Sequence, residues 1–386
     1  MSKTIPPPYN AMQVYMERNP LIMDTLLRKP TVGIPTAWVH LMQHSHIERL
    51  AGAEPGAYPR DPAAVYVAAL KTIGCSFIDQ YIPTNPLEMG DHGYEDATRS
   101  ATTGAHEIRL DGMLIDSPEA AVEHMERFVF PQIRRDIANF DEKALLDNVL
   151  RDEIGHQKFF GEDLLKIGYG FVYIPGMSYG AYGYEHYFSA YALYPEIMET
   201  SFSLQADKCR MHNAAIAKLY ERNLLPPLIR FDQDMADSRG TLVNIRSLDN
   251  IWFPHFARSI EPLVKTGIRL IWHCDGNLMD MVPRLIDAGV NGFQGFQYED
   301  GMDYKKICSM KTRDGDDLLI WAGVSVTRTL PFGGPQDVKD ELKFLVDNGP
   351  RTGLMLSASS SIAPGVPWEN IQTMVDGFAH YRKHGR

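Results

Sequence analysis

The chain has 386 residues, 44% hydrophobic and 23% charged, a composition typical of soluble globular proteins and unlike disordered or fibrous ones. Its 38 Lys and Arg against 49 Asp and Glu give a formal net charge of -11, and no basic segment is dense enough to follow a phosphate backbone, so we expect no nucleic-acid partner. No segment approaches the roughly eighteen unbroken apolar residues of a membrane span, and the start, MSKTIPPPYNAMQ, has no apolar signal segment, so we expect a cytoplasmic protein without a membrane partner.

Short β-rich segments alternate with helical patterns along the whole chain, which indicates βαβ units that feed a parallel sheet. We predict eight strands: PTVGIP (30–35), CSFIDQY (75–81), GFVYIPG (170–176), PPLIRFD (226–232), IRLIWHC (268–274), VNGFQGF (290–296), LLIWAGVS (318–325) and GLMLSAS (353–359). Eight parallel strands are the number that closes a barrel. The sequence therefore predicts an α/β fold in which residues 1–386 form a single TIM (β/α)8 barrel.

The first candidate site residues follow the first strand, in the segment WVHLMQHSH that begins at Trp38. On a helix, His40 and His44 would share one face at i and i+4, a spacing that can bind a metal. The alternative is a polar helix start whose histidines face solvent or substrate. We assign Trp38, His40 and His44 to substrate binding.

Helix signals separate the predicted strands. Asp-Pro at 61–62 opens a helix that Gly74 ends, Ser-Pro at 117–118 opens another, and Pro335 begins a third. Apolar residues repeat on one face of these helices, so we assign those faces to core packing and not to chemistry.

Polar residues also follow the second predicted strand. Asp79 and Tyr81 close it, and Met89 and His92 come soon after in the sequence. We count Tyr81 among the candidate catalytic residues and the other three among the substrate-binding residues.

Two connections are too long for simple crossovers, residues 83–167 after the second strand and residues 177–225 after the third. Both leave the carboxyl ends of strands, which is the catalytic face of a barrel, so we predict insertions that form or cover the site. The second insertion holds aromatic residues that would either line a flat ligand, with Tyr184 as a substrate-binding candidate, or pack on one another. They are Tyr179, Tyr182, Tyr184, Tyr187, Phe188, Tyr191 and Tyr194.

The fourth and fifth predicted strands end in residues with acid–base and metal-binding chemistry. Asp232 and Asp234 lie two apart, where one could act as a general acid or base; alternatively, they orient arginines or cap the next helix. His273 and Asp275 would point the same way from a strand while Cys274 points to the other face. With Glu299 after the sixth strand they would supply the three ligands of a catalytic zinc, and we add Asp232, Asp234 and His273 to the catalytic candidates.

Further polar residues lie at the same predicted face and complete the substrate-binding candidates. They are Asn277 after the fifth strand, Gln297 after the sixth, and Ser359 and Ser360 after the eighth.

Several motifs together resemble the uroporphyrinogen decarboxylase superfamily: IWHCDGN, IDAGVNGFQG, WAGVSVTRTLPFGGPQDVKDELKFLVDNG and LSASSSIAPGVPWENI. The resemblance covers residues 224–380 and extends more loosely to DPAAVYVAALKTIG and NPLEMGDHGYE in the first half. It implies a TIM barrel. The superfamily contains heme-pathway decarboxylases and zinc-dependent methyltransferases that move methyl groups between methylated substrates, corrinoids and thiols.

The chain departs from both branches. The decarboxylases carry arginines after the first strand for substrate carboxylates, where this sequence has WVHLMQHSH, and imidazoles bind carboxylates less well than guanidinium groups. The thiol methyltransferases use a His-x-Cys pair and a late cysteine, which here become His273-x-Asp275 and a serine run. An oxygen-containing metal site suits an ether oxygen better than a thiol.

The resemblance therefore favours a methyltransferase, the O-demethylase type, that moves a methyl group from a small methoxylated, aromatic or otherwise methylated donor to a corrinoid (cobalamin) on a partner protein. Zinc is the expected metal, and a homodimer is the oligomer we consider. The first alternative is a decarboxylase of a porphyrinogen or another acidic substrate, working without metal. The second is a corrinoid- or tetrapyrrole-binding protein without catalysis.

Overall fold

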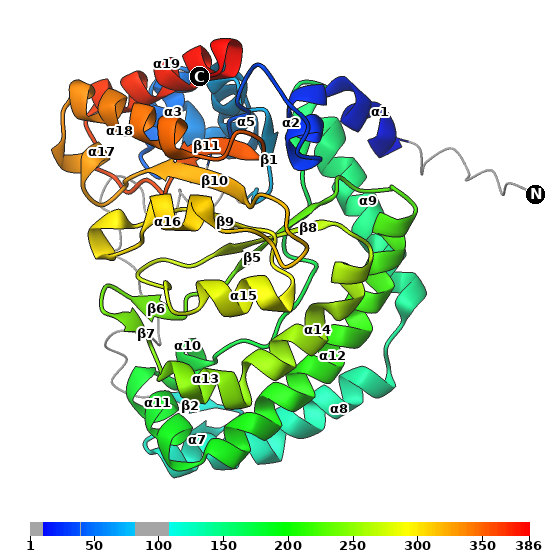
Figure 1. Cartoon of the computed structure of the whole chain (residues 1–386). Helices are drawn as coiled ribbons and strands as arrows, with labels where there is room; N and C mark the ends of the chain where they lie inside the picture. The colour runs from blue at the N-terminus through cyan, green and yellow to red at the C-terminus, as the bar shows by residue number, and fades with distance from the viewer. Residues whose placement is uncertain (1–10, 39, 82–107) are drawn as a thin grey trace, which may run out of the picture.

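The computed structural model describes residues 11–38, 40–81 and 108–386 (Figure 1). Its strands are β1 (Phe77–Ile78), β2 (Arg109–Leu110), β3 (Met113–Leu114), β4 (Leu165–Lys166), β5 (Leu228–Asp232), β6 (Ala236–Asp237), β7 (Gly240–Thr241), β8 (Arg269–His273), β9 (Gly292–Gln294), β10 (Leu319–Val324) and β11 (Leu354–Ala358). Met89 and His92 lie outside the described residues.

The helices before β5 are α1 (Ala11–Arg18), α2 (Pro20–Leu26), α3 (His44–Ala51), α4 (Ala57–Arg60), α5 (Pro62–Ile73), α7 (Pro118–His124), the π-helix η2 (Met125–Val129), α8 (Phe130–Ala138), α9 (Glu142–Phe160), α10 (Tyr179–Tyr182), α11 (Tyr184–Leu193) and α12 (Pro195–Glu221). Those after it are α13 (Ile245–Ile251), α14 (Phe253–Lys265), α15 (Val282–Ala288), the 3-10 helix η3 (Tyr298–Asp300), α16 (Tyr304–Ser309), α17 (Thr329–Phe332), α18 (Pro335–Asn348) and α19 (Trp368–His384). None of the described helices is long and apolar enough to cross a membrane.

A five-stranded parallel sheet in the order β11-β10-β9-β8-β5 forms the centre of the molecule. Its five strands agree with the last five that the sequence predicts. Isolated parallel bridges continue the backbone pairing at both edges, from β11 to Thr36 and from β5 to Gly168. The parallel pair β1-β4 lies between these edges, because the amide of Ser76 donates to Thr36 and the amide of Leu165 donates to Ser76.

The third predicted strand, residues 170–176, is wrong. The strand at this place is β4, which lies inside the segment 83–167 that we predicted as an insertion. The Asn213 side chain on α12 instead satisfies the backbone of Tyr173, accepting from its amide at 3.2 Å and donating to its carbonyl at 2.8 Å. A backbone that is already hydrogen-bonded to a helix side chain does not pair with a strand.

The predicted helix placing His40 and His44 on one face is also wrong, because α3 begins at His44. The backbone before it is extended and pairs with the segment that follows β11. The Ile362 amide donates to the His40 carbonyl, and the Met42 amide donates to the Ile362 carbonyl. The first predicted strand, 30–35, is reduced to the bridge at Thr36.

Helix ends follow the expected capping chemistry. The Asp61 carboxylate accepts from the Ala64 amide at the start of α5, and Gly74 ends that helix with φ of 72°. The Ser117 hydroxyl caps α7 in the same way. Helix α18 begins at Pro335, also as predicted.

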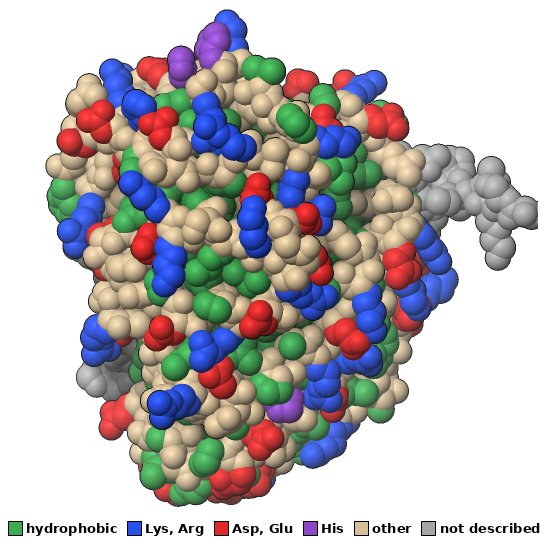
Figure 2. Space-filling view, in the orientation of Figure 1, with side chains coloured by type: hydrophobic (Ala, Val, Ile, Leu, Met, Phe, Trp, Pro, Cys, Tyr) green, Lys and Arg blue, Asp and Glu red, His purple; other side chains and the backbone are tan. Residues whose placement is uncertain are grey.

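Helices from the two long connections gather on one side of the molecule, where α7, α8, α11 and α12 lie together, away from α17, α18 and α19 (Figure 1). The surface in view mixes acidic and basic side chains, without a continuous patch of one sign (Figure 2).

Candidate metal centre at the strand ends

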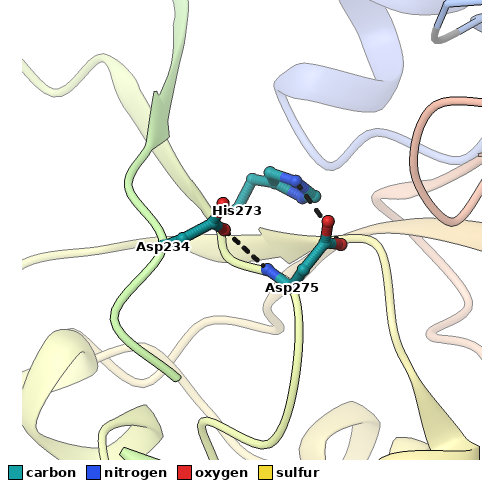
Figure 3. Close-up of side chains that lie close together, drawn as sticks. All are labelled: Asp234, His273 and Asp275. Atoms are coloured by element: carbon teal, nitrogen blue, oxygen red, sulfur yellow. Dashed lines mark hydrogen bonds and ion pairs between the residues drawn. The ribbon is translucent and has the colours of Figure 1, made fainter. Parts of the chain in front are cut away.

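Three side chains with metal-binding atoms meet where β5 and β8 end. Asp232, the last residue of β5, pairs in register with His273, the last residue of β8, and each strand continues into a loop that carries a further aspartate. The possible ligand atoms of Asp234, His273 and Asp275 all lie within 4.8 Å of one another, and no other such group of three occurs among the described residues. Figure 3 shows the three side chains close together, His273 at the end of β8 and the two aspartates in the loops after β5 and β8.

The His273 ring is buried and oriented by a backbone carbonyl. Its Nδ1 lies 3.3 Å from the Gln294 carbonyl oxygen on the neighbouring strand β9, so Nδ1 carries the hydrogen and donates. Its Nε2 faces the Asp275 carboxylate, 3.8 Å from Oδ1. A histidine that binds a metal through one ring nitrogen usually donates the N–H of its other ring nitrogen to a carbonyl or carboxylate in this way.

The Asp275 carboxylate is held from both sides. Gln297 Nε2 donates to one oxygen at 3.2 Å, and the Ser360 hydroxyl donates to the other at 3.2 Å. The backbone amide of Asp275 donates to Asp234 Oδ1 at 3.0 Å, and this hydrogen bond holds the Asp234 carboxylate beside Asp275. Gln297 and Ser360, predicted to bind substrate, therefore position a candidate metal ligand.

Asp232 and Asp234 differ in electrostatic environment. Loss of hydration raises the pKa of Asp234, and the negative charges of Asp275 and Asp232 add to this effect. Loss of hydration acts on Asp232 too, but the charges of His273 and Arg230 and a hydrogen bond from Tyr169 hold the pKa of Asp232 below its usual value. The two neighbouring carboxyl groups therefore shift in opposite directions, because Asp232 contacts the Arg230 guanidinium and Asp234 does not.

A buried arginine below the site was missed by the sequence reasoning. Arg230 on β5 donates from Nε to Asp79 at 2.6 Å and from Nη1 to Asp232 at 2.9 Å. Its guanidinium also lies over the rings of Tyr169 and Trp321. The signal was available in PPLIRFD, where one charged residue interrupts an apolar strand, because a buried charge requires a partner.

Other predicted residues lie outside the group of three. The Glu299 carboxylate accepts from the hydroxyl of Ser325 at 2.7 Å and from that of Thr327, so the structure does not bring it to His273 and Asp275. The Tyr81 ring packs edge-on against Phe160.

Four substrate-binding candidates make internal contacts. Trp38 is buried against Phe378, and His44 packs on Tyr58. The Asn277 side chain accepts from the Met279 amide, and the Ser359 hydroxyl accepts from the Val326 amide.

Two further candidates lie nearer the site. His40 is buried close enough to Arg230 for the guanidinium charge, together with burial, to lower its pKa. Tyr184 is exposed and packs on Tyr179, whose hydroxyl donates to the Asp234 carbonyl at 3.0 Å.

Cys274 turns away from the group, as strand alternation predicts. Its thiol donates to the Asp275 carbonyl and accepts from the Met235 amide. Burial raises the pKa of this thiol to about 12, and its sulfur is hydrogen-bonded to backbone groups and is not part of the group of three.

The donor set fits a divalent metal. One imidazole and two carboxylates supply three ligands, the number that a catalytic zinc takes from the protein while keeping one position open. The 3.8 Å between His273 and Asp275 compares with the roughly 3.4 Å that separates two ligands on a tetrahedral zinc with bonds of about 2.1 Å. The His273 and Asp275 atoms are therefore near the separation that a shared zinc requires, and the Asp234 atom lies within 4.8 Å of both.

Comparison with family models and with curated proteins finds no match for the sequence. Comparison with solved structures finds a methyltransferase from Methanosarcina mazei, 16% identical, with a TM-score of 0.56 over 94% of this chain and 98% of that one. A B12-independent methionine synthase from Shewanella sp. W3-18-1 matches at 10% identity over 58% of this chain and 64% of that one, but its TM-score is 0.36. The chain therefore shares the fold of the first protein.

Proposed function

We propose that the protein is a methyltransferase that takes the methyl group of a small methoxylated donor, preferably an aryl methyl ether, and delivers it to a corrinoid on a partner protein. The observation that carries the proposal is the converging Asp234–His273–Asp275 group, with His273 oriented by Gln294 and Asp275 held by Gln297 and Ser360. The fold shared with a methyltransferase supports this class of reaction.

In the proposed reaction the electron pair of cob(I)alamin forms a bond from cobalt to the methyl carbon, the bond between that carbon and the ether oxygen breaks, and the oxygen takes up a proton from the solvent. A zinc or similar ion held by His273, Asp275 and Asp234 would polarise the ether oxygen. The ionised Asp232, held by Arg230, adds negative charge beside the site and favours a bound cation.

The proposal also includes the architecture that surrounds the site. The bridges at Thr36 and Gly168 support a closed barrel of eight strand segments, and the helices of 108–164 and 177–225 would cover its mouth, as predicted for the two insertions. The corrinoid protein would approach this mouth as a soluble cytoplasmic partner, and a homodimer stays part of the hypothesis.

A decarboxylase of an acidic substrate has less support. Its substrate carboxylates need free cationic partners, and Arg230 is already bound to Asp79 and Asp232. Four aspartates, Asp79, Asp232, Asp234 and Asp275, would repel an anion at this place.

The test is methyl transfer to free cob(I)alamin under anaerobic conditions, with the zinc-loaded protein and a panel of aryl methyl ethers. We expect the absorbance spectrum of methylcobalamin and release of the corresponding phenol. Asp275→Asn should abolish the transfer, whereas Cys274→Ser, which alters the neighbouring buried side chain, should retain it. No methylcobalamin with any donor, or equal rates in the two variants, would contradict the proposal.

A further inference from the structure

A cavity of about 530 Å³ lies between the helices of the two long connections, away from the candidate metal centre. One wall comes from β2, α7, η2 and α8, and the other from α10 and α12. None of Asp234, His273 and Asp275 lines it. Its volume lies in the range of pockets that bind small molecules, about 300–1,000 Å³.

Most of the cavity wall is hydrocarbon. Leu110, Met125, Val129 and Ile133 line the first wall, with Met125 and Ile133 buried. Such a surface favours an apolar ligand body, and the Met125 thioether makes favourable contacts with aromatic rings in particular.

The charged groups of the cavity already have partners of opposite charge. His124 Nε2 lies 2.9 Å from Asp111 Oδ2, and Lys208 Nζ donates to Asp136 at 2.6 Å. A charged ligand would compete with these pairs and would lose its hydration in an apolar pocket, so the ligand that fits is neutral.

Hydrogen-bonding groups remain for one polar function of a ligand. The Tyr182 hydroxyl is 2.9 Å from His124 Nδ1. The Tyr182 oxygen has two lone pairs and one hydrogen, so its contact with Nδ1 leaves it able to accept from a ligand hydroxyl. Ser201 and Gln205 of α12 also line the cavity, and Gln205 Nε2 donates to Ser201 Oγ at 3.2 Å.

We propose that this cavity is a second small-molecule site, for a neutral aromatic molecule that carries a hydroxyl group. The helix α10 connects it to the candidate metal centre, since Tyr182 and Ala181 line the cavity and Tyr179 of the same helix donates to the Asp234 carbonyl. A ligand in the cavity therefore contacts the helix that positions Asp234.

The experiment uses phenol as the probe and isothermal titration calorimetry as the measurement. The full-length protein should bind phenol in this cavity with one-to-one stoichiometry, and Ser201→Phe on α12 and Ala181→Phe on α10, which place a ring into the cavity from two different helices, should each remove that binding. His273→Ala should retain it. Far-UV circular dichroism and an unchanged unfolding midpoint check that each variant is folded.

Tyr182→Phe tests the polar recognition. It keeps the ring and removes the hydroxyl, so phenol binding should weaken while binding of benzene stays the same. Phenol binding that survives both filling variants, or that is lost in His273→Ala, would overturn the proposal, because the probe would then bind elsewhere. Failure of methyl transfer in the earlier test would not change any of these results.

Discussion

At the scale of single residues, the candidate centre depends on side chains that are each fixed by a second group. His273 is oriented by a carbonyl of the next strand, and Asp275 by an amide and a hydroxyl from two different loops. Metal affinity depends strongly on such outer partners, because they set the direction of the ligand atoms before the ion binds.

Metal content is the direct measure of this centre. We expect His273→Ala and Asp275→Asn to lose bound zinc, and Asp234→Asn to bind it more weakly, because each removes one of three converging ligands. Glu299→Gln should keep full occupancy, since Glu299 is bound to Ser325 and Thr327. Elemental analysis of protein purified without chelator checks this, and unchanged zinc in His273→Ala would disprove the ligand assignment.

The buried His40 should make stability depend on pH. Burial and the Arg230 charge lower the pKa of His40 in the folded state. As the pH falls below about 6.5, the usual histidine pKa, the unfolded chain therefore binds a proton at this position before the folded protein does. This stability is complete above the unfolded pKa and is lost as the pH falls toward the lower folded value. The free energy of unfolding should thus fall less between about pH 7 and pH 5 in His40→Gln than in the wild type.

Urea unfolding at several pH values measures that difference. His380→Gln, at an exposed histidine on α19, is the matched control and should leave the slope of stability against pH as it is in the wild type. A His40→Gln variant that keeps the wild-type slope would contradict the role of His40.

Much of the site could be predicted from residues at strand ends. The sequence pointed to His273 and Asp275 as metal ligands and to Asp234 as a candidate acid or base, because functional groups gather at the carboxyl ends of parallel strands. That Asp234 joins the other two is visible only in the structure. Glu299 was misplaced because the η3 turn directs it toward the Ser325 loop, a tertiary contact without a local signal. Arg230 was missed because its partner Asp79 is 151 residues away in sequence.

At the scale of elements, local sequence signals predicted element ends correctly where neighbouring residues determine where a helix begins. Asp61, Ser117 and Pro335 start helices as predicted, since capping involves only the next few residues. The segment 170–176 has the composition of a strand but is not one, because Asn213 on α12 supplies its hydrogen bonds. A contact between segments 40 residues apart cannot be read from strand propensity.

The turn after β9 connects backbone geometry to the metal centre. Gly295 has φ of 69°, and a Cβ there would lie 2.3 Å from the Ser359 carbonyl oxygen and 3.3 Å from His273 Nδ1. Gly267 has a similar φ of 74°, but a Cβ there would meet no atom within 4 Å. Substituting alanine at Gly267 would thus test backbone strain alone, whereas substituting it at Gly295 would add a steric clash.

We expect Gly267→Ala to lower the free energy of unfolding by about 1 kcal/mol, the cost of a side chain in the left-handed region, without changing zinc affinity. Gly295→Ala should lower stability further and also weaken zinc binding, because the Ser359 backbone and the His273 ring must move. Denaturant titration and zinc titration of both variants make the comparison. Equal zinc affinity in the two would show that Gly295 does not position His273.

At the scale of the whole molecule, the two ends of the parallel strands have different roles. The carboxyl ends carry the charged centre, whereas side chains nearer the amino ends form an apolar cluster that α1 and α2 cover. Met16, Ile22 and Leu26 of these helices pack against residues of β1, β4, β5, β8, β10 and β11. The covered cluster therefore contributes to stability at the end of the sheet opposite the charged centre.

Leu26 and Leu27 provide a matched pair for testing that division. Leu26 is fully buried in the cluster, and Leu27, the next residue, is 45% exposed. Leu26→Ala should lower the free energy of unfolding by about 2–5 kcal/mol, the usual cost of a buried cavity of this kind. Leu27→Ala should change it by less than about 0.5 kcal/mol.

Because the cluster connects six strands to the amino-terminal helices, circular dichroism and tryptophan fluorescence should report the unfolding of Leu26→Ala at the same denaturant concentration. Zinc binding by folded Leu26→Ala should stay at the wild-type level. A loss of zinc in that variant would mean that the covered cluster is not separate in function from the metal centre. Two separate transitions would mean that the cluster does not hold the six strands together as one cooperative unit.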